Sequence, residues 1–132
     1  RTGRLRTVNR RRLLLDELTD DLDRDGSFTS TVFHGMAELV ALRASSEAFS
    51  PKSPQRVLAG PPWLFGVARG LDDDRHLVLV SVSDRDRAVR LADLGEDGRW
   101  RDRLAAPGTA SYGPEDTIVL PPWGVAWLAV TG

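Results

Sequence analysis

Two Ser-Pro pairs, at residues 50–51 and 53–54, separate a helical half of this chain from a half built of short strands. Before them the apolar residues recur at helical spacing, and after them short apolar runs alternate with turn residues such as Gly60-Pro61. Short strands at this spacing predict an antiparallel β-sandwich. We therefore expect an α+β chain with an N-terminal arm, one or two helices and a C-terminal β domain, its strands at residues 55–58, 63–69, 76–83, 88–91, 100–104, 117–120 and 125–130.

The helical half predicts two helices with a break at Gly26. The first covers residues 13–22, where leucines recur at helical spacing, and Ser27 is a candidate N-cap for the second, at residues 28–45. Apolar side chains surround most of the second helix, which is typical of a helix covered on more than one side. The chain offers only one β domain as cover, so we expect a neighbouring domain to be missing. We also expect the isolated chain to bind apolar dyes or to form a homo-oligomer through this helix.

The run Leu77-Val78-Leu79-Val80-Ser81-Val82 is apolar at nearly every position. A strand with one face in water carries polar residues at alternate positions, whereas a continuous apolar run is typical of a strand covered on both faces. We expect this strand to be central in its sheet and buried on both sides.

Composition excludes several classes of protein. The 132 residues have room for one domain, or for a small domain and an arm, and the net charge of −1 gives no general attraction to nucleic acid or to an anionic membrane. The arm holds six arginines in residues 1–12 but no aromatic side chain for base stacking, so we expect no nucleic-acid partner. No apolar run suits a membrane span or a signal segment, and we expect a cytoplasmic protein that does not bind membranes. Cysteine is absent, which excludes thiolate metal sites and disulfides.

One stretch resembles a calcium-binding loop. Residues 21–28 place acidic residues at the first, third and fifth loop positions and Gly26 at the sixth, between two predicted helices. The twelfth position needs a bidentate acid and holds Val32. We therefore favour an acidic helix end, a Gly stop and a Ser cap, and we expect no metal ion; a calcium-dependent interaction module is a third-ranked alternative.

Tryptophan and histidine provide further candidates. The chain has four tryptophans, Trp63, Trp100, Trp123 and Trp127. The faces of their rings could stack on sugars, and the chain would then be a stand-alone β-sandwich carbohydrate-binding module. Trp123 and Trp127 flank a terminal apolar strand, so we favour core packing for both. His34 and His76 have no serine and acid partners suggested by spacing, and we expect structural roles for them.

The stretch Arg6-Thr7-Val8-Asn9-Arg10 resembles the Arg-x-Ile-Asn-Arg motif of sucrose phosphorylases and their close relatives in the α-amylase superfamily. Later passages resemble the same family in the same order, with Ser81 in place of a usual Asn and Trp123 in place of a usual Tyr; they are Ala48-Phe49-Ser50-Pro51, Leu79-Val80-Ser81-Val82-Ser83 and residues 120–128. The resemblance implies that residues 1–50 end a catalytic (β/α)8 barrel, as a loop plus closing helices, and that residues 51–132 are the C-terminal β domain. It also implies substrate binding by Arg6, Asn9 and Arg10, with Arg6 at the glucose subsite.

The family reaction that this resemblance implies is retaining glucosyl transfer, in which an Asp nucleophile and a Glu acid/base act in turn and phosphate takes the glucose. Both carboxylates belong to earlier barrel strands, and no segment of this chain matches them. We therefore expect a C-terminal fragment that is inactive alone, works with a missing catalytic barrel on a sugar substrate and phosphate, and needs no cofactor.

Overall fold

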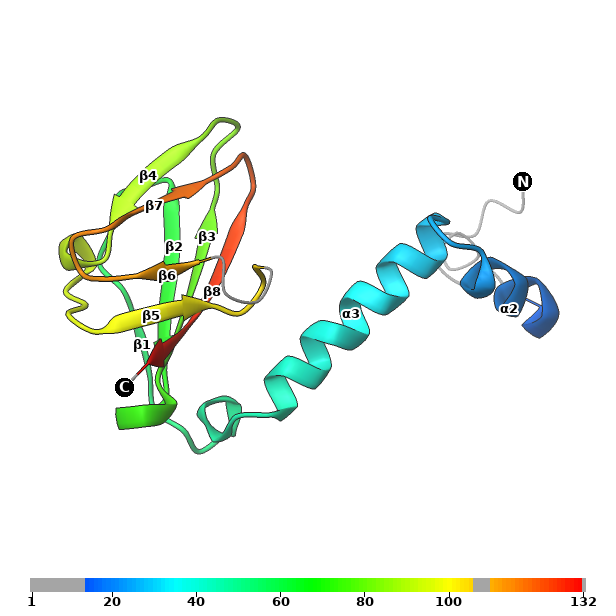
Figure 1. Cartoon of the computed structure of the whole chain (residues 1–132), viewed down its shortest axis with the longest axis horizontal. Helices are drawn as coiled ribbons and strands as arrows, with labels where there is room; N and C mark the ends of the chain where they lie inside the picture. Colours follow the sequence, from blue (N-terminus) through cyan, green and yellow to red (C-terminus); the bar gives the residue numbers. More distant parts are fainter. Residues whose placement is uncertain (1–13, 106–109, 132) are drawn as a thin grey trace, which may run out of the picture. The chain divides into compact units, whose positions relative to one another are not determined.

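The computed structural model describes residues 14–105 and 110–131. The chain divides into two compact units between Ala41 and Leu42. The first unit holds helix α2 (Leu15–Asp23) and most of helix α3 (Phe28–Ala44), and the second holds all eight strands of the described part (Figure 1). Helices followed by a β domain of antiparallel strands confirm the predicted fold class.

The break between the helices follows from two local features. Gly26 has a φ of +75°, a backbone conformation that glycine adopts without the steric cost of a Cβ atom. The Ser27 hydroxyl then accepts a hydrogen bond from the Ser30 backbone N–H at 3.0 Å, which is the N-cap that the sequence predicts. Capping satisfies one of the backbone donors that the first turn of α3 leaves free.

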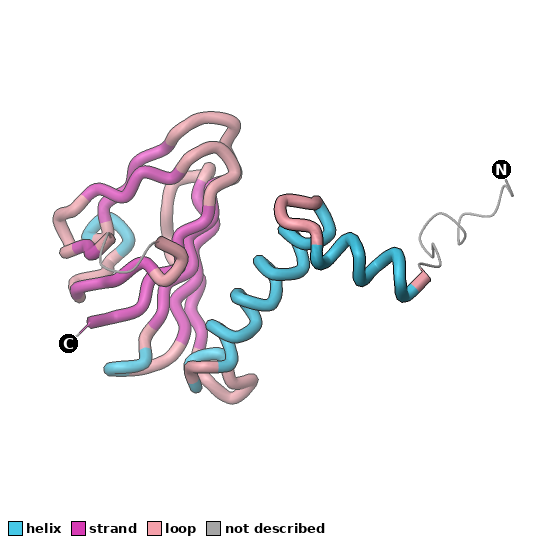
Figure 2. Tube along the Cα trace, turned by 45° about the vertical axis from the view of Figure 1, so that its right-hand side comes forward, coloured by secondary structure: helices cyan, strands magenta, loops and turns pink. Residues whose placement is uncertain are grey.

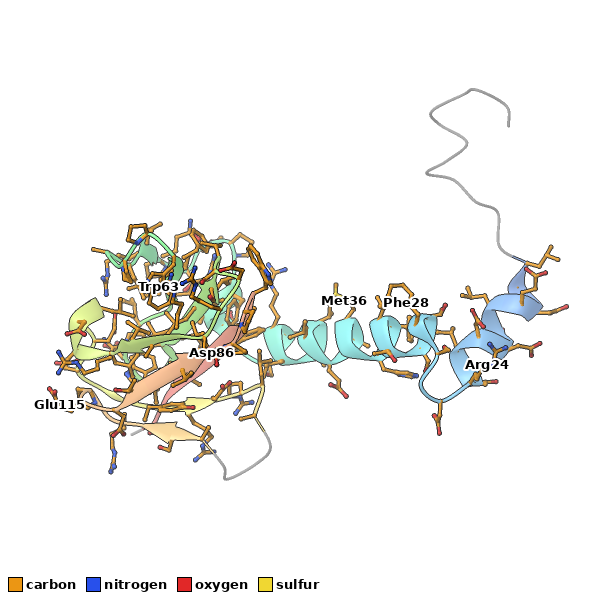
Figure 3. All side chains as sticks on the ribbon, turned by 90° about the horizontal axis from the view of Figure 1, so that it is seen from above. Arg24, Phe28, Met36, Trp63, Asp86 and Glu115 are labelled. Carbon is orange, nitrogen blue, oxygen red and sulfur yellow. The ribbon has the colours of Figure 1, made fainter. Side chains whose placement is uncertain are left out.

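Helix α3 carries apolar side chains that stay exposed in its unit. Phe28, for example, is 85% exposed, and Figure 3 shows the side chains of Phe28 and Met36 projecting outward from the helix. The exposed apolar side chains are Phe28, Val32, Phe33, Met36, Leu39 and Val40. A soluble helix normally turns such residues towards a core, so this surface lacks a partner in the described part of its own unit.

The β unit contains a six-stranded sheet with the order β1-β2-β3-β8-β5-β6 and a two-stranded sheet of β4 and β7 (Figures 1 and 2). Every recorded strand pair is antiparallel. The strands are β1 (Gln55–Val57), β2 (Leu64–Arg69), β3 (His76–Ser81), β4 (Arg87–Arg90), β5 (Arg99–Asp102), β6 (Ser111–Tyr112), β7 (Thr117–Leu120) and β8 (Val125–Thr131).

One face of the six-stranded sheet forms the hydrophobic core together with β4 and β7. Leu77 and Leu79 of β3 and Leu128 of β8 are fully buried there, and Trp100 fills the core from β5. The other sheet and its flanking turn supply the opposing side chains, which are Val89, Leu91, Leu94, Ile118 and Leu120. Burial of these apolar side chains is the main favourable term that holds the sandwich together.

Strand β3 lies between β2 and β8, so its predicted central position in the sheet is correct. The prediction that it is buried on both faces is wrong. Its inward side chains are buried, but Val78 and Val80 are only half-buried and Val82, just beyond the strand, is exposed. Phe49 packs on the outward side chain of His76, while Val78 and Val80 on the same face stay partly open. Strand β6 has only two residues and was not predicted, since so short a run carries no periodicity.

The described residues also form three short 3₁₀ helices. These are η1 (Glu47–Phe49) between α3 and β1, η2 (Asp72–Asp74) between β2 and β3, and η3 (Ala92–Leu94) between β4 and β5. Gly70, before η2, has a φ of +83°, and a Cβ atom there would overlap the carbonyl oxygen of Asp74. This position therefore requires glycine. Among the described residues, no helix is both long and apolar enough to cross a membrane.

Candidate functional site

The substrate-binding residues predicted from the sequence, Arg6, Asn9 and Arg10, lie outside the described residues. Their roles therefore stay predictions. The structure does describe the calcium-like loop, where the Asp21 carboxylate pairs with Arg24 at 3.1 Å and accepts a hydrogen bond from the Thr29 hydroxyl at 3.1 Å. Within residues 14–105 and 110–131, no cluster of three His, Asp or Glu side chains is arranged to hold a metal ion.

The four tryptophans divide between core and surface. Trp100 lies in the main core, and Trp127 is buried as predicted, but on the opposite face of the sheet, where it packs against Phe49. The same prediction for Trp123 is wrong, because its side chain is 65% exposed and its backbone has a φ of +55°. The cause is the turn between β7 and β8, where the Gly124 N–H bonds back to Pro121 and the chain reverses before β8 begins. Trp63 is half-buried, with the Arg87 guanidinium 5.9 Å from the centre of its ring.

The Asp74 carboxylate accepts hydrogen bonds from the side chain and backbone of the linker segment Ser46–Ser50 and holds this segment on the β unit. One oxygen accepts a hydrogen bond from the Ser46 hydroxyl at 2.7 Å, and the other accepts one from the Ala48 N–H at 2.8 Å. Burial would raise the pKa of this carboxyl. The hydrogen bonds from Ser46, Ala48 and His76 outweigh burial, so the pKa lies below its ordinary 3.8. Asp74 is therefore charged at neutral pH and binds the linker through charge-assisted hydrogen bonds.

Arg69 and Phe49 complete the attachment of the linker segment. The Arg69 guanidinium donates to the carbonyls of Ala48 and Ser50, both at 3.0 Å. The Phe49 ring lies against the rings of His76 and Trp127, with ring centres 5.0 and 4.8 Å apart. Polar bonds on both sides of an aromatic anchor fix the point at which the chain joins the β domain.

His76 links Asp74 to the core strand β8. The indole N–H of Trp127 can only donate, and it reaches Nδ1 of His76 at 3.0 Å, so Nδ1 must be an acceptor. The imidazole is therefore neutral, with its proton on Nε2, which lies 3.3 Å from the Asp74 carboxylate. Burial lowers the pKa of His76 below 6.5, against the opposing effect of Asp74, and Arg103 lowers it further.

These contacts define what Ser46, Asp74 and His76 can do chemically. A general base needs a free nitrogen within reach of a substrate proton. Both nitrogens of His76 are occupied, and the Ser46 hydroxyl donates to Asp74 instead of to the imidazole, so the three residues do not form a Ser-His-Asp triad. The role is structural, as predicted for His76. Sequence patterns did not single out Asp74, because it stands in a run of three aspartates that predicts only a turn.

A buried charge, Glu96, lies after η3. Its carboxylate is almost fully buried and accepts a hydrogen bond from Arg56 at 2.5 Å, while Arg75 lies 4.0 Å away. The Arg75 guanidinium stacks 5.1 Å from the centre of the Trp100 ring. This carboxylate joins the β1 edge of the large sheet to the turn that closes the core, and its arginine partners offset the cost of burying it.

Comparisons with known proteins agree with the resemblance noted from the sequence. Over 85 residues, or 63% of its length, the chain is 35% identical to a glucosylglycerate phosphorylase from Spirochaeta thermophila, and it spans 14% of that protein. No protein-family model matches the chain.

Solved structures show the same fold. AmyP, solved in complex with maltose, superposes with a TM-score of 0.63 at 21% identity, over 80% of this chain and 22% of that one. Isomaltulose synthase from Erwinia rhapontici, solved with D-glucose, gives a TM-score of 0.61 at 14% identity, over 86% of this chain and 20% of that one. These superpositions show that the chain has the fold of one part of AmyP and of isomaltulose synthase, and its sequence is similar to a short part of the phosphorylase.

Proposed function

We propose that this chain is the C-terminal part of an enzyme that moves glucose from an α-glucoside to phosphate. In this reaction the glycosidic bond breaks, the leaving group takes a proton, and glucose 1-phosphate forms with retention. Sucrose is the donor that the Arg6–Arg10 motif favours, and glucosylglycerate is the donor in the name of the relative at 35% identity. The identity to that phosphorylase is the single observation that carries the proposal.

Residues 1–50 would then end the catalytic (β/α)8 barrel and residues 51–132 would form the C-terminal β domain. The exposed apolar side chains of α3 support this division, since a barrel layer would cover them. The nucleophile and the acid/base would belong to the barrel. The chain would contribute Arg6, whose guanidinium can bridge a carboxylate and sugar hydroxyls, while Asn9 and Arg10 would shape the same loop.

The test uses two proteins: this chain alone and the longer enzyme with a barrel ahead of it. Each is incubated with sucrose or glucosylglycerate, with and without phosphate, and glucose 1-phosphate is measured. We expect the longer enzyme to release it from one of the donors only when phosphate is present, and the 132-residue chain to release none. Free glucose formed at the same rate without phosphate would identify a hydrolase instead. Glucose 1-phosphate is an anion, and an anion crosses an apolar membrane poorly. A reaction that forms it therefore favours a cytoplasmic location.

Trp123 supports a second candidate, a stand-alone carbohydrate-binding module. Its exposed ring could stack on a pyranose, and its positive φ is a backbone strain of the kind often found at functional positions. Calorimetry of the chain with maltose or sucrose tests this, with Trp123→Ala as the variant and Trp63→Ala as the control. Binding that disappears only with Trp123→Ala would favour the module over the enzyme fragment.

A further inference from the structure

Two turns of identical sequence flank the end of strand β3. Pro61-Pro62-Trp63 leads into β2 and Pro121-Pro122-Trp123 leads into β8, and each turn closes with a backbone hydrogen bond of 2.9 Å to the carbonyl of its first proline. Both turns also bond to the residues that follow β3. The Val82 N–H donates to the Trp63 carbonyl at 2.8 Å, and the Trp123 N–H donates to the Ser83 carbonyl at 3.0 Å. The same tripeptide therefore lies on both sides of one strand end.

The two tryptophan rings have different surroundings. Trp63 is half-buried and packs against the core. Trp123 is 65% exposed, and its backbone has a φ of +55°, a conformation that glycine adopts at lower cost. Neither core packing nor local backbone preference explains a tryptophan at position 123. A large exposed ring on a strained backbone is a pattern that is common at ligand sites.

Charged side chains of the turn between β3 and β4 lie next to Trp123. Strand register pairs Arg87, at the start of β4, with Leu120, at the end of β7. The turns that join β3 to β4 and β7 to β8 therefore meet at one end of the sandwich, where the bond from Trp123 to the Ser83 carbonyl connects them (Figure 1). The β3–β4 turn exposes the three charged residues Asp84-Arg85-Asp86.

Hydrogen bonds hold the β3–β4 turn in a defined shape. The buried Ser83 hydroxyl accepts one from the Arg85 N–H at 3.3 Å and one from Nε of Arg87 at 3.1 Å. Asp84 pairs with Arg85 at 3.5 Å, whereas the Asp86 carboxylate forms no ion pair with a described residue. A turn that is fixed in this way loses little conformational entropy when it binds a ligand.

An exposed indole face beside two carboxylates suits a sugar. The C–H groups on one face of a pyranose are apolar and stack on an aromatic ring, while the hydroxyls around its edge donate to carboxylate oxygens. A proline-rich peptide also stacks on aromatic rings, but its proline residues have no N–H groups to donate to the acids. The two carboxylates of the turn therefore favour a sugar over such a peptide.

We propose that Trp123 and the β3–β4 turn form a non-catalytic binding site for α-glucosides, with the indole as the stacking surface and Asp86 as an acceptor for sugar hydroxyls. The site goes beyond the proposed glucose transfer, because it uses neither phosphate nor a catalytic carboxylate. All its residues belong to the β unit, so it would act in the longer enzyme as well as in a stand-alone module. It lies at the end of β3 opposite His76 and the linker attachment, roughly 17 Å along the strand.

An NMR titration of the ¹⁵N-labelled 132-residue chain with maltose tests the inference. We expect the indole N–H signal of Trp123 and the backbone N–H signals of residues 84–86 to shift along one saturation curve. Trp63, in the same tripeptide, is the internal control and its indole signal should shift much less. The absence of any shift up to about 20 mM maltose overturns the inference. Equal shifts of both indole signals also overturn it, since maltose then acts only on the solvent.

Substitutions of Trp123 separate sugar stacking from a role in the fold. Trp123→Tyr keeps an aromatic face, and this variant should still bind maltose. Trp123→Gly removes the ring together with the cost of the positive φ, so it should abolish the shifts of residues 84–86 without lowering Tm. A lower Tm of Trp123→Gly would show that the ring holds the fold together, and the assignment would then be wrong.

Asp86 is tested against a matched acid elsewhere. Asp86→Ala removes a hydrogen-bond acceptor and should weaken maltose binding about fivefold. Glu115, an exposed acid before the other end of β7, is the control, and Glu115→Ala should leave binding unchanged (both residues are labelled in Figure 3). Equal binding by the two variants would remove Asp86 from the site.

Further outcomes identify the ligand and keep the site apart from the proposed reaction. A proline-rich peptide that shifts the Trp123 signal at a lower concentration than maltose would overturn the assignment to sugars. Maltose binding at Trp123, combined with a longer enzyme that forms no glucose 1-phosphate, would refute the glucose transfer and retain the site. Glucose 1-phosphate formation without maltose binding by this chain would refute the site alone.

Discussion

The attachment of the linker segment predicts a large effect of Asp74→Ala on stability. The substitution removes the acceptor for the Ser46 hydroxyl, the Ala48 N–H and the His76 Nε2–H. It leaves the core side chains untouched. Any change in the free energy of unfolding therefore reports the linker attachment together with the bond to His76.

The magnitude follows from the surroundings of each bond. Hydrogen bonds to a charged group contribute about 1.5–3 kcal/mol each, so three would give roughly 5–9 kcal/mol if all were fully buried. They are not, since the Asp74 side chain is 45% exposed and water can replace part of what is lost. The buried Ala48 N–H also keeps the Ser46 hydroxyl as a second acceptor at 3.1 Å. We therefore expect a loss of about 2–3 kcal/mol, which in a domain of this size lowers Tm by roughly 10–20 °C.

Urea unfolding of the full chain, followed by the fluorescence of the buried Trp100 and Trp127, measures this loss. The midpoint should fall by about 1–2 M. Asp73→Ala is the matched control, because Asp73 is exposed in the same turn, and it should change stability by less than about 0.5 kcal/mol. Asp74→Asn keeps an acceptor oxygen and should lie between the two. If Asp74→Ala and Asp73→Ala unfold at the same urea concentration, the carboxylate does not hold the linker.

Three further predictions concern charge and substrate binding. The pKa of His76 is lower in the folded chain than in the unfolded chain, so its stabilising effect is complete above pH 6.5 and is lost as the pH falls below that value. His76→Gln should remove this part of the pH dependence of the urea midpoint. Glu96→Ala leaves its arginine partners without an acceptor and should cost about 2–3 kcal/mol by the same assay, less than a fully buried pair because Arg56 is half-exposed, while Glu96→Gln should cost less. In the longer enzyme, Arg6→Ala should lower kcat/KM at least ~10-fold by removing a charge-assisted bond, and Arg6→Lys should not restore it. Arg12→Ala is its control, and equal effects at Arg6 and Arg12 would show only a diffuse basic patch.

Local rules predicted most of the elements. The Gly26 break and the Ser27 cap depend on backbone geometry that neighbouring residues determine, and the structure has both. The strands were placed within a few residues, because period-two alternation and turn residues mark them directly. The position of β3 in the middle of its sheet followed from its apolar run alone.

Such rules do not predict contacts between residues that are far apart in the sequence. Asp74 bonds to residues 26 and 28 positions earlier, and the Trp127–His76 bond spans 51 positions. Nothing in the local pattern marks these residues as partners, since their meeting depends on the order of strands in the sheet. Trp123 was placed wrongly for a different reason: its neighbours are apolar, but the local turn directs its ring outward.

The wrong prediction for β3 carries information of its own. A strand that is apolar on both faces and open on one has a sequence suited to a contact that the described β unit lacks. Helix α3, in the other unit, has the same property. Self-association could cover one such surface through a self-complementary contact, but a helix and a sheet face would each need such a contact of their own. In the proposed enzyme α3 would be covered within the barrel of which it is part, and no self-association would be needed to cover it.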